Sequence, residues 1–367
     1  MTEITPPLTA LTRPEDLLAA GLAAADEAEM LAQVAESFRI RITPAMQAAI
    51  AAPGDAADPI AAQFVPRAAE LITRPEELAD PIGDGAHAPV PGLTHRYPDR
   101  VILHITKTCD VYCRFCFRRE TVGETGPLSD SGLDMALAYI AFTPAVREVI
   151  LTGGDPLTLS PRRIGAVIRR LNLIPHVEMI RIHTRVPVVA PERIGAALIA
   201  ALRAARPTLW IVVHTNHAQE LTPPARAALA RLVEAGVPLL SQSVLLRGVN
   251  DSVAALSDLF RTLLALRVKP YYLHHCDLAP GTASFRTTID AGRGLMRALR
   301  GAISGTALPA YVLDIPGGFG KVPITAEHFA PGAAPGLWRV TDWQGGVHDY
   351  ADPGAAPAPG ADASEAD

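Results

Sequence analysis

Three cysteines within eight residues constrain this chain more than any other feature. They form the run Cys109-x3-Cys113-x2-Cys116, directly after a predicted strand. Three thiolates spaced in this way can hold three irons of a four-iron cluster and leave the fourth iron open to another ligand. An odd number of cysteines in so short a segment does not satisfy disulfide geometry. Structural zinc is the alternative, but zinc usually takes four ligands, and the one other cysteine, Cys276, lies far along the chain.

The composition bears on which classes of function are open to the chain. A net charge of -5 over 367 residues gives no electrostatic basis for binding nucleic acid. No run of about 18 apolar residues predicts a membrane span, and the first residues lack the basic and apolar regions of a signal peptide. Four cysteines, three of them clustered, suit a reducing cytoplasm. We therefore expect a cytoplasmic protein that binds neither nucleic acid nor membranes.

The chain divides into four predicted segments. Residues 1–94 read as helices joined by proline-rich turns, and residues 95–305 form the main α/β domain. Residues 306–350 are a C-terminal segment that carries Lys321. Residues 351–367 contain little beyond Ala, Pro, Gly and acidic side chains, so they have nothing to bury and are expected to be a disordered tail.

From about residue 100 the pattern becomes a regular alternation of apolar strands and amphipathic helices. Such alternation predicts a parallel sheet with right-handed crossovers. Six βα units and a seventh strand predict an open, partial (β/α)6-type form of the (β/α)8 barrel. The expected strands are 101–106, 148–152, 178–183, 209–214, 238–245, 271–275 and 310–314, and the expected helices lie near 130–142, 161–172, 191–204, 223–235, 252–266 and 287–303.

Polar clusters follow the predicted strands, at the edge where the active sites of barrel enzymes lie. The cysteines follow the first strand, and Gly153-Gly154-Asp155 follows the second. The other rim residues are Arg185, His214, His217, Gln242, His274, His275, Asp277 and Asp314. We expect one site at this rim; His214 and His217 receive no role, because their spacing in a loop does not define a metal pair.

Lysine is rare in this chain, which makes its positions informative. It occurs only at Lys107, Lys269 and Lys321, and arginine supplies almost every other cation. A guanidinium cannot form a Schiff base, so a lysine that persists can be one whose primary amine is needed. Lys321 follows the glycine-rich loop 316–320, which lets the backbone approach a planar or phosphorylated ligand such as pyridoxal phosphate (PLP). A solvated loop lysine is the alternative interpretation.

Several blocks together resemble a known family. The cysteine run, with Phe115 before its last cysteine, resembles the signature of radical S-adenosylmethionine (SAM) enzymes. From about residue 58 to about residue 350, the chain resembles the lysine 2,3-aminomutase family, radical SAM enzymes that also use PLP. The matching blocks are 90–101, the cysteine run with Arg118-Arg119, 153–156, 181–189, 242–251, 276–287 and 316–321. The resemblance implies conversion of L-lysine to β-lysine by a 1,2-amino migration.

The resemblance also implies cofactors and site residues. It implies a [4Fe–4S] cluster on the three cysteines, SAM at the open iron, and PLP bound covalently to Lys321. For the substrate, Arg118 would pair with the α-carboxylate, while Asp277 and Asp314 would hold the ε-ammonium. The remaining implied contacts are Gly153, Gly154, Asp155 and Gln242 with SAM, and Arg96 and Arg100 with the PLP phosphate.

Other interpretations stay open. Arg118 could be a surface cation, and Asp277 and Asp314 could be turn residues. The substrate could be glutamate or arginine, and an iron–sulfur protein without turnover is a further alternative. The resemblance implies a reductant such as flavodoxin or ferredoxin and a homo-oligomer, and it leaves a role in modifying elongation factor P open. Two departures matter: no cysteine follows Cys276 to bind the zinc of larger members, and Phe319 replaces a common glycine, with an expected effect on the PLP pocket.

Overall fold

A nine-stranded sheet is the framework of the molecule, whose computed structural model describes residues 9–123, 126–325, 328–342 and 344–351. The strands lie across the sheet in chain order; β2 to β8 are parallel, and β1 and β9 are antiparallel edge strands. Their bounds are β1 Leu93–Tyr97, β2 Arg100–Thr106, β3 Glu148–Gly153, β4 Met179–Thr184, β5 Thr208–His214, β6 Leu239–Leu245, β7 Val268–His275, β8 Ala310–Asp314 and β9 Lys321–Pro323. The predicted open barrel with seven parallel strands is confirmed.

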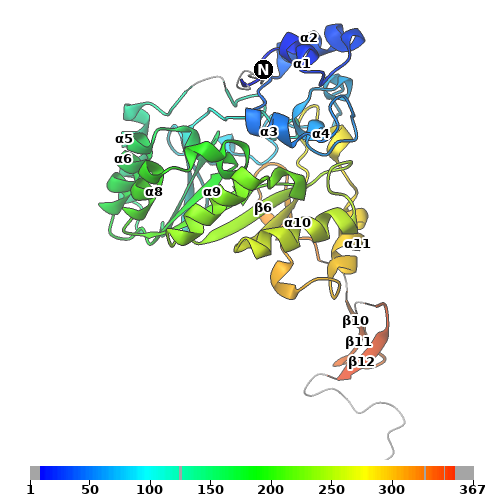
Figure 1. Cartoon of the computed structure of the whole chain (residues 1–367). Helices are drawn as coiled ribbons and strands as arrows, with labels where there is room; N and C mark the ends of the chain where they lie inside the picture. The colour runs from blue at the N-terminus through cyan, green and yellow to red at the C-terminus, as the bar shows by residue number, and fades with distance from the viewer. Residues whose placement is uncertain (1–8, 124–125, 326–327, 343, 352–367) are drawn as a thin grey trace, which may run out of the picture.

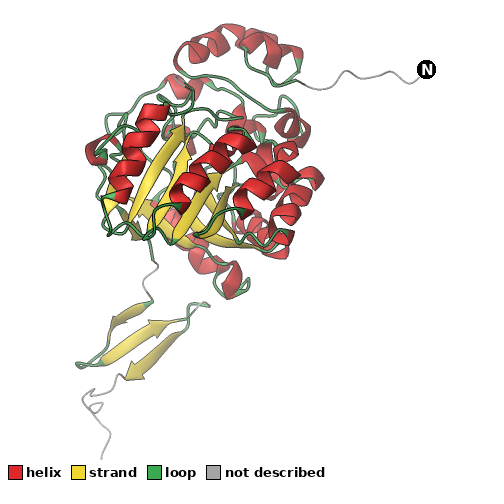
Figure 2. Ribbon diagram, turned by 90° about the vertical axis from the view of Figure 1, so that its left-hand side faces the viewer, coloured by secondary structure: helices red, strands yellow, loops and turns green. Residues whose placement is uncertain are grey.

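Helices connect the parallel strands and cover the outer face of the sheet (Figure 2). The sequence encodes where several of them begin: the hydroxyls of Ser129, Ser160 and Ser252 each accept a hydrogen bond from the backbone N–H three residues later, which satisfies a free donor of the first turn. Helix α8 is shorter than the predicted 191–204, because a separate turn, Pro191–Arg193, precedes it. The crossover helices are α5 Asp130–Ala141, α6 Pro161–Asn172, α8 Ala196–Arg203, α9 Pro223–Glu234, α10 Val253–Ala265 and α11 Ile289–Leu299.

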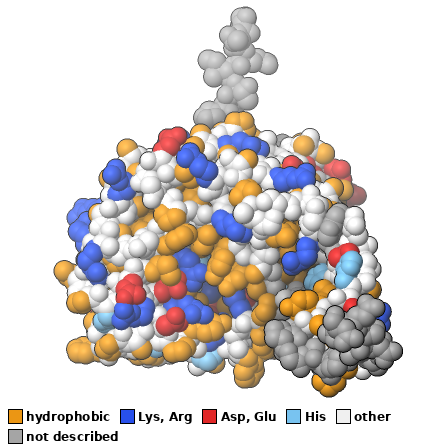
Figure 3. All heavy atoms as spheres, turned by 90° about the horizontal axis from the view of Figure 1, so that it is seen from below, with side chains coloured by type: hydrophobic (Ala, Val, Ile, Leu, Met, Phe, Trp, Pro, Cys, Tyr) orange, Lys and Arg blue, Asp and Glu red, His pale blue; other side chains and the backbone are white. Residues whose placement is uncertain are grey.

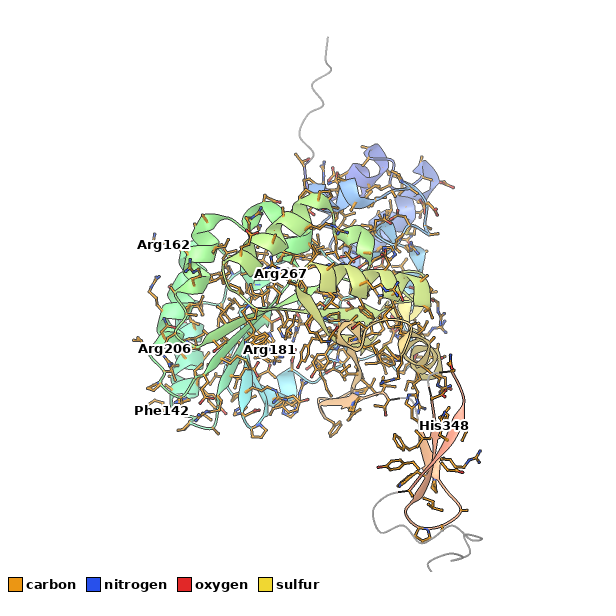
Figure 4. All side chains as sticks on the ribbon, turned by 60° about the horizontal axis from the view of Figure 1, so that its bottom comes forward. Phe142, Arg162, Arg181, Arg206, Arg267 and His348 are labelled. Atoms are coloured by element: carbon orange, nitrogen blue, oxygen red, sulfur yellow. The ribbon has the colours of Figure 1, made fainter. Side chains whose placement is uncertain are left out.

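Successive side chains of a strand face opposite sides of the sheet, which produces both the core and the cavity. In β4, Ile180 and Ile182 are fully buried, whereas Arg181 and His183 line the concave side. Figure 4 shows Arg181 within the curve of the sheet, while Phe142 lies at the outer edge of the molecule. Polar side chains can therefore gather inside the barrel without interrupting its apolar outer layer.

The first part of the chain forms short helices that pack beside the loop after β2 (Figure 1). The Thr43 hydroxyl, at the start of α3, donates to the Val189 carbonyl at 2.5 Å and so ties this segment to the barrel. None of the described helices combines the length and the apolar character needed to cross a membrane. The helices of this segment are α1 Pro14–Ala19, α2 Ala28–Ser37, α3 Pro44–Ala49 and α4 Ala61–Phe64.

The last part of the chain holds strands that the sequence analysis did not predict. Strand β9 returns antiparallel to β8 and places Lys321 opposite Asp314 in the ladder. A separate antiparallel sheet of β10 Phe329–Pro331, β11 Leu337–Thr341 and β12 Val347–Ala351 projects from the body (Figure 1). Ala351 thus belongs to a strand, and the rest of the expected tail, residues 352–367, lies outside the described residues.

Candidate active site

One cavity of about 780 Å³ lies within the curve of the sheet. Seen from below, the molecule is hollowed at its centre, where Lys and Arg side chains gather between hydrophobic ones (Figure 3). The cavity brings together all the residues to which the sequence analysis gave a site role. They are Arg96, Arg100, Cys109, Cys113, Cys116, Arg118, Gly153, Gly154, Asp155, Gln242, Asp277, Asp314 and Lys321. The fold therefore makes one candidate site of them, although their separate roles stay predictions.

The loop after β2 carries the three cysteines, all of which have free thiols. Two buried arginines anchor this loop to the N-terminal segment: Arg114 Nε lies 2.9 Å from Glu70 Oε1, and Arg119 pairs with the same carboxylate. Burial raises the pKa of the Cys116 thiol to about 11. The thiol is therefore neutral near pH 7, and binding iron would release its proton. Three free thiols on one anchored loop fit a cluster that has three cysteine ligands.

Two glycines hold the loop after β3 against the chain that leads to the cysteines. A Cβ atom on Gly153 would lie 2.3 Å from the Thr106 carbonyl oxygen, and one on Gly154 would lie 2.3 Å from that of Thr108. The Gly154 N–H donates to the Thr106 carbonyl at 2.6 Å. No side chain fits into this approach, so the structure explains both glycines by packing. The SAM contact predicted for them is a separate question and stays a prediction.

Asp155 joins the carboxyl ends of β3 and β4. Its carboxylate accepts hydrogen bonds from the Thr184 hydroxyl at 2.6 Å and from the Arg185 N–H at 2.5 Å. Burial raises the pKa of Asp155 to about 6, although these hydrogen bonds oppose the shift. Gln242 also faces the cavity, from β6, where it lies opposite His214 of β5 in the ladder. Asp155 therefore lines the cavity and also holds the ends of β3 and β4 together.

Lys321 is held by ionic and backbone contacts. Its Nζ lies 2.5 Å from Asp314 Oδ1, and the second Asp314 oxygen lies 3.2 Å from His274 Nδ1. The Lys321 backbone N–H donates to the Tyr97 hydroxyl at 2.8 Å. Burial disfavours the Asp314 carboxylate, but the hydrogen bond with His274 and the charge of Lys321 outweigh it and lower the pKa of Asp314 to about 2. A primary amine is thus fixed in the cavity beside a permanent negative charge.

Asp277 is the second carboxyl group at this end of the cavity, and its environment differs sharply from that of Asp314. Burial and the nearby charge of Asp314 raise the pKa of Asp277 to about 7, while Lys321 opposes the rise. Two neighbouring carboxyl groups cannot both ionise easily, so one of them retains a proton. A second cation that enters the cavity would favour ionisation of both. A cation bound between the two carboxyl groups would therefore be stabilised by both of them.

Two of the cavity arginines, Arg96 and Arg118, share an acidic partner that the sequence did not reveal. Arg118 donates from Nε and Nη2 to Asp84 Oδ2 at 2.9 and 2.6 Å, and Arg96 Nη2 lies 3.4 Å from Asp84 Oδ1. Arg118 is therefore no solvated surface cation. Burial disfavours the charged form of Asp84, but the positive charge of Arg118 outweighs this effect and lowers the pKa of Asp84. Asp84 thus links the arginine predicted for the PLP phosphate to the one predicted for the substrate carboxylate.

Several further residues line the cavity from within the strands, and no role was predicted for them from the sequence. His183 is half-buried, and its buried Nε2 atom has no hydrogen-bond partner among the described residues. Burial lowers the pKa of His183 well below its usual value, so the ring is neutral. Arg181 and Glu148 form a pair at 2.7 Å within the same cavity. The two-residue period of β4 contained the signal, since it places Arg181 and His183 on one face.

His214, His217 and Phe319 were also singled out in the sequence, and they lie in different surroundings. His214 lines the cavity, whereas His217 accepts a hydrogen bond from the Gln219 N–H in a turn, so the two rings serve different places. The Phe319 side chain is 80% exposed and does not line the cavity, and its effect on the PLP pocket stays a prediction. The loop bends so that Phe319 points to solvent while Lys321, on the adjoining strand, faces inward.

Residues 103–260 match the Radical SAM superfamily. The chain is 44% identical over 304 residues to L-lysine 2,3-aminomutase of Clostridium subterminale, which covers 83% of this chain and 73% of the relative. The enzyme of the same name from Fusobacterium nucleatum is 42% identical over 329 residues, covering 89% and 77%. Glutamate 2,3-aminomutase of Clostridioides difficile is 36% identical over 322 residues, covering 88% and 75%.

Proposed function

Because this chain belongs to the lysine 2,3-aminomutase family of radical SAM enzymes, we propose that it moves the α-amino group of L-lysine to Cβ and forms β-lysine. The observation that carries the choice of lysine is the carboxyl pair of Asp277 and Asp314. Both line the cavity that also holds Arg118 and Lys321. Two carboxyl groups suit the compact ε-ammonium of lysine, whereas glutamate would add a third negative charge.

We propose the predicted cofactor contacts for the same cavity. Cys109, Cys113 and Cys116 would hold the [4Fe–4S] cluster of a radical SAM enzyme, and Lys321 would hold PLP. When bound, the cluster with SAM supplies a radical that removes hydrogen from the substrate, and PLP supplies a π-system through which the nitrogen can move. The protein contributes a cavity that contains the cluster loop and the lysine together. Positioning within it would provide most of the chain's own share of catalysis.

The substrate would be held at both ends. The Arg118 guanidinium, already oriented by Asp84, can form a bidentate pair with the α-carboxylate. Asp314 can receive the ε-ammonium once Lys321 is engaged with the cofactor, and Asp277 would ionise to complete the site. Contacts at both ends fix which carbon faces the radical source. The reaction needs this, since abstraction from the wrong carbon would not lead to the β-amino product.

Asp314→Asn should weaken the use of lysine far more than the binding of SAM. An ammonium left without its buried carboxylate typically costs about 3–5 kcal/mol, so we expect KM for lysine to rise roughly 100-fold or more. The measurement is steady-state formation of β-lysine under anaerobic conditions, with SAM affinity determined separately. PLP occupancy is read from visible absorbance, because Asp314 also contacts Lys321.

Asp290→Asn is the matched control for this variant. It removes the same charge from an exposed position in the first turn of α11, outside the cavity. It should leave the kinetics with lysine unchanged. Unaltered lysine kinetics in Asp314→Asn, or a wild-type preference for glutamate or arginine over lysine, would contradict the proposed substrate while leaving the family assignment intact.

The affinity for lysine should depend on pH through Asp277. Its pKa is raised to about 7, so below neutrality the carboxyl is mostly protonated and pairs poorly with an ammonium. The ε-ammonium itself stays protonated in this range. The affinity for lysine is therefore highest above the pKa of Asp277. It falls as the pH drops below that pKa, by up to about tenfold per pH unit. Values of KM for lysine measured on either side of neutrality test this.

The variant Asp277→Asn separates this group from others that titrate nearby. Its affinity for lysine should be lower throughout, and the slope below neutrality should flatten. A slope that persists in Asp277→Asn would assign the pH dependence to another residue, and a flat wild-type profile would remove the pH prediction altogether.

We further propose the setting in which the enzyme works. A four-iron cluster on free cysteines needs a low-potential electron donor, for which a small flavodoxin or ferredoxin is suited, and the cysteine chemistry favours the cytoplasm. We propose a homo-oligomer, to be tested by light scattering. The β-lysine could serve free amino acid metabolism or the modification of elongation factor P. Measuring whether the product is consumed by a ligase that acts on that factor distinguishes the two.

A further inference from the structure

Arg185 makes a direct contact with one of the cysteines. It follows β4 and caps helix α7, Val186–Val189, so its backbone belongs to the rim of the barrel. Its Nη1 atom lies 2.8 Å from Cys113 Sγ and donates a hydrogen bond to it. The side chain is buried and lines the cavity. The guanidinium thus presents a permanent positive charge and an N–H group to a sulfur that is predicted to bind iron.

A buried hydrogen-bond network holds this guanidinium in place. Its Nη2 atom donates to Gln63 Oε1 at 2.6 Å and to Glu220 Oε2 at 2.7 Å. Gln63 and Glu220 are fully buried, and Gln63 Nε2 in turn donates to Glu220 Oε1 at 3.1 Å. Asn216 donates from Nδ2 to Gln63 Oε1 at 2.9 Å. Contacts from the N-terminal segment and from the loop after β5 therefore fix the guanidinium in one orientation, in which Nη1 points to the Cys113 sulfur.

We propose that Arg185 tunes the cluster: its N–H···S hydrogen bond to Cys113 and its charge raise the reduction potential of the bound cluster. This inference deepens the proposed function and rests on it, because it requires Cys113 to be an iron ligand. In this assignment Arg185 contacts the sulfur of an iron ligand and contacts neither the substrate nor PLP. Its role is therefore to position Cys113 and to set the potential of the cluster. The ligand class concerned is a [4Fe–4S] cluster with three cysteine ligands.

The physical basis is the negative charge that the cluster gains when it takes up one electron. Part of that charge lies on the thiolate sulfurs, where an N–H donor and a cation stabilise the reduced form more than the oxidised form. The low dielectric of a buried site strengthens both effects. Glu220 opposes them, since its carboxylate neutralises the same guanidinium from the other nitrogen. The potential should therefore respond to Arg185 and Glu220 with opposite signs.

The test is the midpoint potential of the reconstituted cluster, measured by redox titration followed by electron paramagnetic resonance on the full chain. Arg185→Gln removes the charge and should shift the potential to a more negative value, with iron and sulfide content retained. Arg185→Lys keeps the charge but loses the fixed fork of donors, so its potential should lie between those of Gln and wild type. This partial recovery by lysine is an outcome that loss of packing alone does not give.

Two further variants make the test specific. Glu220→Gln removes the opposing charge and should shift the potential to a more positive value than wild type. Arg231→Gln is the matched control, because Arg231 is an exposed arginine of α9 whose Nε donates to the Ile194 carbonyl at 2.8 Å and whose Nη2 donates to the Pro191 carbonyl at 3.1 Å. It removes an equal charge that touches no sulfur and is screened by solvent, so its potential should stay at the wild-type value.

The outcomes separate this inference from the proposed function. Equal potentials in wild type and Arg185→Gln overturn the inference alone, as does a shift of Glu220→Gln in the same direction as Arg185→Gln. If Arg185→Gln does not fold, Arg185→Lys and Glu220→Gln decide, with a negative and a positive shift expected. A wild-type chain that takes up no four-iron cluster overturns the proposed function and this inference together.

Discussion

Lys321→Ala should abolish turnover and remove the visible absorbance of bound PLP. The Nζ atom of Lys321 lies in the cavity, held 2.5 Å from Asp314 Oδ1, and alanine offers no amine with which to anchor the cofactor. A misplacement of 1 Å can already lower a rate about 100-fold, and loss of the anchor should cost more. The absorbance of protein titrated with PLP, and β-lysine formation by the same preparation, measure the two effects. The iron–sulfur signal should persist, since the cysteines lie on another loop.

Lys269→Ala is the matched control for this result. Lys269 Nζ donates to the Leu308 carbonyl at 3.0 Å and to the Pro270 carbonyl at 2.7 Å, so its amine serves the backbone of neighbouring segments. It does not line the cavity. This variant should keep the visible band and the activity. Borohydride reduction followed by peptide mapping identifies the lysine that carries PLP. An adduct on Lys269 or Lys107 instead of Lys321 would contradict the prediction.

Cys113→Ala should remove the four-iron signal and the cleavage of SAM together. Two of three thiolates cannot hold the cluster in place, and without an open iron SAM has no partner that delivers an electron. The expected loss is complete: no reducible cluster, no 5′-deoxyadenosine, and no β-lysine. PLP binding should be retained, because Lys321 is placed by β9 and not by the cysteine loop. Iron content, magnetic resonance spectra and chromatography of SAM products measure these points.

Cys276→Ala provides the comparison within the same chain. Cys276 is 2% exposed and packs in an apolar cluster with Phe115 and Phe285, so its thiol is used for packing. Alanine preserves most of this contact, and the cluster and SAM cleavage should survive. Formation of 5′-deoxyadenosine at the wild-type rate by Cys113→Ala would disprove the cluster assignment. Loss of iron in Cys276→Ala would instead indicate a fourth protein ligand.

The sequence predicted the barrel well because its strands and helices are strongly periodic. The regular alternation of apolar strands with amphipathic helices leaves few alternatives to a parallel sheet, and all seven predicted parallel strands are present. The edge strands were missed for a physical reason. Strand β9 has only three residues, Lys321–Pro323, and includes a proline, so it forms only by pairing with β8. Local pattern cannot reveal a strand that its neighbour creates.

The site was predicted through motifs, and its gaps lie where function depends on partners that are distant in sequence. Arg118 and Lys321 could be selected from their motifs and their residue types. Asp84, Glu220 and Gln63 could not, because each acts through a contact to a residue far along the chain. Acidic or amide residues in loops are common, and only the folded chain shows which of them hold an arginine in the cavity.

The pairing of β9 with β8 makes the length of the loop between them as important as its composition. Asp314 and Lys321 are directly opposite in this antiparallel ladder, so their side chains project to the same side of the sheet. Inserting or deleting one residue between them would slip the register and turn the lysine away from the cavity. Exchanges that keep the count are tolerated more easily where a side chain points outward, as that of Phe319 does. As such sequences diverge, the number of residues in this loop is therefore constrained, and so are Gly317, Gly318 and Gly320, whose φ angles are all positive.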